Sequence, residues 1–205
     1  MLKRVENVQR FRQGSKRKGT RGCANRPTEF YVGTVNDVPY LAIPETSSEN
    51  RVYIPMAFLN PTDLSSNAIR MLPNATLCHF GILTSSMHMA WTRCVCGRLK
   101  SDYRYSAKIV YNNFPWPEAS DGQRERVESL AQAVLDVRAK YPDATLADLY
   151  DPKAMPPDLV KAHRKLDRAV ERLYRSAPFK SDSDRVALLF QRYKVPVEKL
   201  EEKLG

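Results

Sequence analysis

The amino-acid sequence changes character at Pro117. Before this position, short runs of β-branched and aromatic residues, namely 30–32, 40–43 and 51–54, alternate with Pro, Asn and Asp, as in strands joined by turns. After it, apolar residues recur every three or four positions over long stretches, which indicates helices with one buried face. The sequence therefore predicts an α+β fold, with a mixed strand/helix region followed by an all-helical C-terminal region.

The first of these regions is expected to contain one helix. Thr84 or Ser85 is a typical start signal for it, and Gly97 is a typical stop signal. From residue 98 to residue 111 the pattern favours strand again, until the proline-rich segment 114–117 ends it.

The second region opens with a capping box, in which Ser120 can accept a backbone hydrogen bond while Gln123 reaches back. The pair Pro156-Pro157 is typical of the start of a second helix. A third helix is expected over residues 183–194, followed by a short charged helix over 197–204.

Residues 1–27 differ from both regions. Their first part has apolar residues at helical spacing and predicts a short amphipathic helix. Residues 13–22 are rich in glycine and cations and predict a flexible basic arm, which can lie along phosphates or remain a solvated linker. The expected division is therefore residues 1–27, 28–117 and 118–205. The arm's candidate phosphate contacts are Lys16, Arg17, Lys18 and Arg21.

A formal net charge of +10 favours polyanionic partners, nucleic acid first and an anionic membrane second. The alternative is a basic surface with no specific partner. No stretch reaches the roughly 18 to 20 apolar residues of a membrane span, and no signal-peptide core follows Lys3-Arg4. Four clustered cysteines do not form a secreted disulfide framework. We expect a cytoplasmic protein that does not bind membranes.

Catalytic and metal motifs are weak. Cys94 and Cys96 invite a zinc site with His79 or His88, but the second cysteine pair of a structural zinc site is missing. A nucleophile formed by His88 and Cys94 is poorly aligned on a helix. Neither a glycine-rich cofactor loop after a strand nor an Asn-Pro-Pro-aromatic motif is present. We expect no metal, no cofactor and no catalytic residue in this chain, and we expect His163 to lie on the surface.

The segment 98–106 has the strongest functional pattern. If it is a single strand, Lys100, Asp102 and Arg104 lie on one face. The other face then carries Leu99, Tyr103 and Tyr105. Alternating donors and acceptors of this kind match the base edges in a DNA major groove. The alternative is an edge strand with solvated charges and a local Lys100–Asp102 pair.

This segment also lies in a longer stretch that resembles a known family. Residues 79–81, 84–86, 88–91, 95–106 and 109–117 resemble the target recognition domain of MmeI-like, type IIL restriction–modification enzymes, which are single-chain adenine methyltransferases, often with a nuclease. The similarity covers about the first 117 residues and is strongest from His79 onwards. The helical remainder resembles the C-terminal region of the same family.

The resemblance implies roles for particular positions. Lys100 and Asp102 align with a pair that recognises one base pair near the end of the site, and Ala68 and Arg104 with a pair that recognises another. The Lys–Asp combination implies a G·C pair with guanine on the strand that faces Lys100. Arg98 joins the basic arm as a candidate phosphate contact.

The implied function is sequence-specific recognition of double-stranded DNA for an adenine-N6 methyltransferase or restriction enzyme. We expect the chain to be a remnant or a piece of that parent, inactive alone, with a catalytic methyltransferase domain in cis or in trans and S-adenosylmethionine as the parent's cofactor. Two alternatives stay open. One is a small enzyme, and the other is an interaction module whose helical tail docks a partner subunit. The charges on that tail favour nucleic acid, and they are Lys161, Arg164, Lys165, Arg168 and Arg172.

Overall fold

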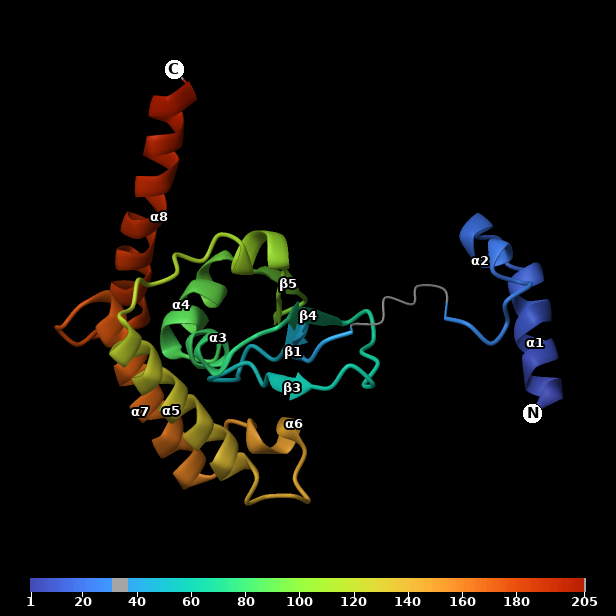
Figure 1. The fold of residues 1–205 in the computed structure, drawn as a ribbon, viewed down its shortest axis with the longest axis horizontal. Coiled ribbons are helices and arrows are strands. Elements are labelled where there is room, and N and C mark those ends of the chain that lie inside the picture. Colours follow the sequence, from blue (N-terminus) through green and yellow to red (C-terminus); the bar gives the residue numbers. More distant parts are fainter. Residues whose placement is uncertain (31–36, 205) are drawn as a thin grey trace. The chain divides into compact units, whose positions relative to one another are not determined.

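A computed structural model describes residues 1–30 and 37–204 of the protein. The chain forms two compact units, Met1–Asp37 and Val38–Gly205, and each is described by itself (Figure 1). Within the described part of the chain, every helix is too short or too polar to cross a bilayer.

The first unit contains the helices α1 (Leu2–Gln13) and α2 (Lys18–Gly22). The Arg12 guanidinium folds the chain after α2 back onto α1, because it donates hydrogen bonds of 2.5–3.0 Å to three backbone carbonyls. Those carbonyls belong to Cys23, Arg26 and Glu29. The predicted amphipathic helix is confirmed. The prediction of a flexible arm is wrong at Lys18–Gly22, where the chain is helical.

The second unit begins with two small antiparallel sheets (Figure 1). The first has the order β3–β1–β4, with the bounds Ala57–Leu59, Tyr40–Pro44 and Ile69–Pro73. The second has the order β2–β6–β5, with the bounds Thr46–Ser47, Asp102–Arg104 and Gly97–Leu99.

Only part of the strand prediction before residue 60 is correct. Residues 40–43 form a strand as predicted. Residues 51–54 do not, although Tyr53 and Ile54 are buried, because these side chains enter the core from a loop that ends at Pro55. A third run predicted as strand, residues 30–32, falls mostly outside the described residues.

The predicted helix after Ser85 is confirmed as α4 (Ser86–Val95). The Ser85 side chain accepts a hydrogen bond from the backbone N–H of His88, so it satisfies one of the free amides of the first turn. The helix ends at Val95, two residues before Gly97.

Two further helical elements in this region were not predicted. The helix α3 (Leu77–Leu83) starts at a capping box in which the His79 side chain takes the place usually held by Glu or Gln, opposite Thr76. A short π-helix occupies Ala107–Tyr111, where the pattern indicated a strand. Burial of Val110 and the Trp91 indole bond to its carbonyl, at 3.0 Å, accompany this turn.

After Pro117 the described chain is helical, so the predicted α+β class is confirmed. The capping box of Ser120 and Gln123 forms as predicted. The helices are α5 (Asp121–Arg138), α6 (Leu146–Leu149), α7 (Pro157–Tyr174) and α8 (Asp182–Leu204). The short helix α6 was missed, and α8 runs on where we expected two helices.

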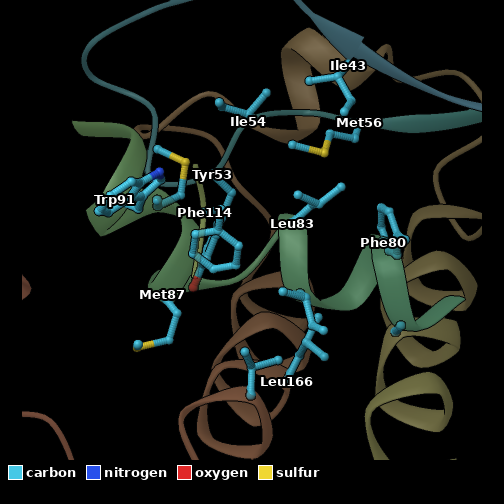
Figure 2. Packing of buried hydrophobic residues seen from close by; sticks show 14 of the residues in the cluster. Ile43, Tyr53, Ile54, Met56, Phe80, Leu83, Met87, Trp91, Phe114 and Leu166 are labelled. Carbon is cyan, nitrogen blue, oxygen red and sulfur yellow. The ribbon is translucent and has the colours of Figure 1, made fainter. Parts of the chain in front are cut away.

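The strand-containing and helical regions share one hydrophobic core. Phe80 and Leu83 of α3 lie on the side of this helix that faces Ile43 and Met56, and Leu166 of α7 lies on its other side (Figure 2). The approach is close at Gly81, where an added Cβ would lie 2.8 Å from Val127 and 3.3 Å from Ala131. Glycine is therefore the residue that lets α3 pack into this groove between α5 and α7.

Buried polar contacts also join the two regions. Asp167 of α7 accepts hydrogen bonds from the Tyr53 hydroxyl at 2.6 Å and from the Ser86 backbone N–H at 2.7 Å. Burial raises the pKa of Asp167 to about 6, while these two hydrogen bonds lower it. One carboxyl group therefore ties a loop and the start of α4 to the helical region.

His163 lies in the same junction, so the prediction of a surface position is wrong. Its side chain is fully buried, stacks on Tyr53 with the ring centroids 4.1 Å apart, and lies 2.7 Å from the Tyr150 hydroxyl. Burial, with a further contribution from Arg138, lowers its pKa to about 3. The Arg138 guanidinium is also buried and donates to Tyr150 and to the backbone carbonyl of Met56. The residues next to His163 in the sequence are mostly charged, which is why a surface position was predicted.

Candidate nucleic-acid interface

The segment 98–106 forms a hairpin, so the prediction of one continuous strand is wrong. Strand β5 pairs with β6 so that Leu99 lies opposite Asp102 and Gly97 opposite Arg104. Residues 100–101 form the turn, and Lys100 has a φ of 56°. Lysine is uncommon in this left-handed region, which glycine adopts without strain. Lys100 therefore lies at the hairpin tip and not in line with Asp102 and Arg104.

The alternation predicted for β6 does hold along its own length. Tyr103 and Tyr105 are buried, Asp102 is half-buried, and Arg104 is exposed. Leu99 differs from the expectation, since it is 51% exposed and does not join the two tyrosines. The hairpin therefore directs polar side chains outward, while buried aromatic rings anchor its backbone to the core.

Hydrogen bonds fix those two tyrosines. The Tyr105 hydroxyl lies 3.0 Å from Nε2 of the buried His88, and the Tyr103 hydroxyl donates to the Glu49 carbonyl at 3.1 Å. Burial lowers the pKa of His88 to about 3, so the ring is neutral. Arg98 covers the outer face of the Tyr103 ring, with its guanidinium carbon 4.2 Å from the centroid. It also donates to the Ser101 carbonyl in the turn.

Glu45 organises the other end of β6. Its carboxylate contacts Arg104 Nε at 3.4 Å and Arg70 at 3.0 Å. Its backbone N–H donates to the carbonyl of Ala68 at 2.8 Å, while its own carbonyl accepts from the N–H of Tyr105 at 2.7 Å. Ala68 and Arg104, which are distant in sequence, are thereby both brought next to Glu45.

Ala68 is exposed in the turn that precedes β4. The structure thus brings together Ala68 and Arg104 at one end of β6, and Lys100 and Asp102 at the other. At the second end, Asp102 Oδ1 accepts a hydrogen bond of 3.3 Å from the Glu49 backbone N–H. The chemical groups available here are an ammonium, a carboxylate, a guanidinium and a methyl group, which are groups that can contact base edges.

Sequence reasoning missed Glu45 and Glu49. Neither belongs to a motif, and their importance comes from contacts with residues more than 50 positions away, such as Arg104 and Asp102. Only the proline before Glu45, which marks the end of β1, gave a local signal.

The four candidate phosphate contacts of the N-terminal segment have exposed side chains in the first unit. Arg21 donates to the Ser15 carbonyl at 2.7 Å. These four candidates are Lys16, Arg17, Lys18 and Arg21. Arg98, the fifth candidate phosphate contact, belongs to the hairpin of the second unit, where it packs on Tyr103 as described above.

The side chains considered for zinc are not brought together. His79 caps α3, His88 is buried against Tyr105, and Cys94 is exposed on α4. Among residues 1–30 and the described part of 37–204, no group of three or more His, Cys, Asp or Glu side chains has a metal-binding arrangement.

Comparison with known proteins assigns the chain. Residues 1–118 match the family model described as "MmeI, target recognition domain", and residues 119–201 match "MmeI, C-terminal domain". The chain belongs to the MmeI family. The boundary between the two models lies one residue after Pro117, where the sequence changes character.

Two longer relatives agree with this assignment. The type IIL restriction–modification enzyme MmeI, solved in complex with DNA, is 46% identical with a TM-score of 0.89, over 96% of this chain and 26% of that one. DNA methyltransferase A of Bacillus subtilis (strain 168) is 40% identical over 196 residues. Those residues are 96% of this chain and 22% of the relative, so the chain spans about a quarter or less of either protein.

Proposed function

We propose that this MmeI-family chain is the sequence-specific DNA recognition module of an adenine-N6 DNA methyltransferase or restriction enzyme. It binds double-stranded DNA in the cytoplasm and does no chemistry alone. Its partner is a catalytic methyltransferase domain, in cis or in trans, which uses S-adenosylmethionine. The 46% identity to an enzyme solved in complex with DNA supports this function over a docking role for the helical tail.

One structural observation carries the proposal for the bases. Glu45 holds the turn of Ala68 and the end of β6 together through two backbone hydrogen bonds, so Ala68 and Arg104 lie beside the same residue. A two-stranded ribbon fits the major groove of B-DNA. In this proposal Ala68 and Arg104 recognise one base pair, and Lys100 and Asp102 at the hairpin tip recognise another.

The identity of one base pair follows from the chemistry at the tip. Lys100 donates to the O6 and N7 acceptors of guanine, and Asp102 accepts from the N4 amino group of cytosine. The proposed pair is therefore G·C, with guanine on the strand that faces Lys100. Residues 28–117 supply recognition, residues 118–205 support it, and the cations of residues 1–27 and Arg98 bind phosphates.

Selection from a randomised duplex library tests the proposal. The wild-type chain is expected to enrich a motif, with affinity that falls steeply between 50 and 200 mM salt because phosphate contacts dominate binding. The swap Lys100→Glu with Asp102→Arg is expected to invert one base pair of that motif. The matched swap Lys140→Glu with Asp143→Arg changes exposed residues away from the hairpin by the same charges and is expected to leave the motif intact.

A second variant separates recognition from folding. Lys100→Gly removes the ammonium but favours the turn, since glycine adopts the φ of 56° without strain. We expect this variant to unfold at a denaturant concentration no lower than wild type, yet to lose preference at one base pair by about 1–3 kcal/mol. An unchanged motif in both Lys100 variants would contradict the assignment of this residue.

A further inference from the structure

A second basic surface lies on the helical region. The helices α5 and α7 run side by side, and α3 packs into one groove between them at Gly81 (Figure 1). A second groove between the two helices is open and has a volume of about 720 Å³. Leu130 and Ala169 contribute to its floor. Its cationic lining residues are Arg126, Lys165, Arg168 and Arg172.

This groove continues along α7. A second depression of about 380 Å³ shares Lys165 and Arg168 with the first. It adds Lys161 and Arg164 to the lining. We call the six cations of the two depressions the α5–α7 basic groove. All six side chains are exposed, and no Asp or Glu lines either depression.

These cations have no partner, in contrast to arginines elsewhere in the second unit. Arg93 pairs with Asp182, Arg175 with Asp184 and Arg185 with Glu171. Within the described part of the chain, none of the six groove cations forms an ion pair or a hydrogen bond. Six like charges held along one groove repel each other, so the arrangement favours binding of a polyanion.

The surroundings of the groove favour nucleic acid over an acidic protein. Protein interfaces usually have an apolar centre and few lysines, whereas DNA-binding surfaces are strongly positive. None of the residues that line the two depressions is a large exposed hydrophobic residue. Four of the six cations are arginines, whose planar guanidinium groups bind phosphate oxygens in pairs.

The length of the groove also fits a duplex. Cations three or four positions apart form one stripe along α7, namely Lys161, Lys165, Arg168 and Arg172. At a rise of 1.5 Å per residue, this stripe is about 16 Å long. A DNA strand places a phosphate roughly every 3.4 Å along the helix axis. Several phosphates can therefore contact the stripe together, which a single small anion cannot do.

We propose that the α5–α7 basic groove binds the phosphate backbone of duplex DNA without regard to sequence. The inference rests on the proposed DNA-binding function and adds a second contact surface to it. Since no residue of α3 or of the two sheets lines the groove, it is a surface separate from the hairpin, and in this proposal it holds another segment of the DNA. Residues 118–205 then contribute affinity, while the hairpin contributes sequence preference.

Salt titrations of four versions of the chain test this proposal. The groove variant is Lys165→Ala with Arg168→Ala and Arg172→Ala, and the control is Lys140→Ala with Lys153→Ala and Lys180→Ala, which removes three other exposed cations. Wild type and a hairpin variant complete the set, and the hairpin variant is Lys100→Ala with Asp102→Ala and Arg104→Ala. Each lost phosphate contact lowers the slope of log affinity against log salt by about 0.9.

The groove variant is therefore expected to lose about 2.7 units of slope, whereas the control keeps the wild-type slope. Between 50 and 200 mM salt, wild type would lose about 40-fold more affinity than the groove variant. If the slope of log affinity against log salt is the same for the groove variant and the control variant, the inference is wrong. The hairpin variant tests the proposed function separately, because it is expected to lose motif preference while keeping the contribution of the groove to the slope.

Lysine modification of the unaltered chain gives a readout that does not depend on folding of a variant. A random-sequence duplex is expected to protect Lys161 and Lys165 from an acylating reagent and to leave Lys140 and Lys153 reactive. Protection by tripolyphosphate or by poly-glutamate, but not by duplex, would assign the groove to a free phosphate or to an acidic protein. Either result would refute the proposal.

Discussion

Asp167→Asn provides a quantitative test of the junction between the two regions. The Asp167 carboxyl is buried, and burial is the largest cause of its pKa of about 6, against 3.8 for a free side chain. A folded-state pKa above the unfolded one means that the folded protein binds the proton more tightly. This group therefore stabilises the fold least at high pH, and stability is regained as the pH falls through about 6 toward 4.

The shift of about two pKa units corresponds to about 3 kcal/mol of lost stability at neutral pH, at 1.36 kcal/mol per unit. Asparagine carries no charge, so its variant avoids this loss while its amide can still bond to Tyr53 and to the backbone of Ser86. We expect the variant's stability relative to wild type to increase by about 2 kcal/mol between pH 4 and pH 7.5.

Urea unfolding at several pH values measures this difference. The buried residues His88 and His163 act in the opposite direction, because their pKa values of about 3 lie below the unfolded value and the fold loses stability as the pH falls below about 6.5. Both proteins contain these histidines, so their contribution cancels in the comparison. Asp143→Asn, at an exposed position, serves as the control. Parallel stability curves for wild type and Asp167→Asn would refute the reasoning.

Three further substitutions test the packing. Gly81→Ala gains about 1 kcal/mol of helix propensity but places a methyl group 2.8 Å from Val127, so thermal unfolding should show a net loss of up to about 2 kcal/mol. Arg138→Leu leaves the Met56 carbonyl without its buried donor, and chemical denaturation should show a loss of at least about 2 kcal/mol. Thr92→Val removes a buried hydroxyl with no partner, so the midpoint of unfolding should stay equal or rise.

Much of the fold was predictable because it depends on local signals. The capping residues Ser85 and Ser120 act within three positions of themselves, and both helices start where these residues indicate. The apolar periodicity of α7 likewise follows from one buried face. Such features need no knowledge of the rest of the chain.

The errors arose where distant contacts override local preference. Lysine at position 100 is not a turn residue, so the hairpin was taken for one strand, although buried Tyr103 and Tyr105 hold the turn in place. His163 was expected on the surface because its neighbours are charged, yet its partner Tyr53 lies 110 positions earlier. For the candidate site, the residue types could be identified but their grouping around Glu45 could not.

The two buried tyrosines in and just after β6, Tyr103 and Tyr105, have a consequence for the evolution of this protein. They fix the backbone of the hairpin from inside, while the outward side chains contribute little to folding. Exchanges at exposed positions such as 68 and 104 usually change stability by no more than about 0.5 kcal/mol. New combinations of outward side chains can therefore accumulate on an unchanged framework, and a lineage can acquire a different target without passing through an unfolded intermediate.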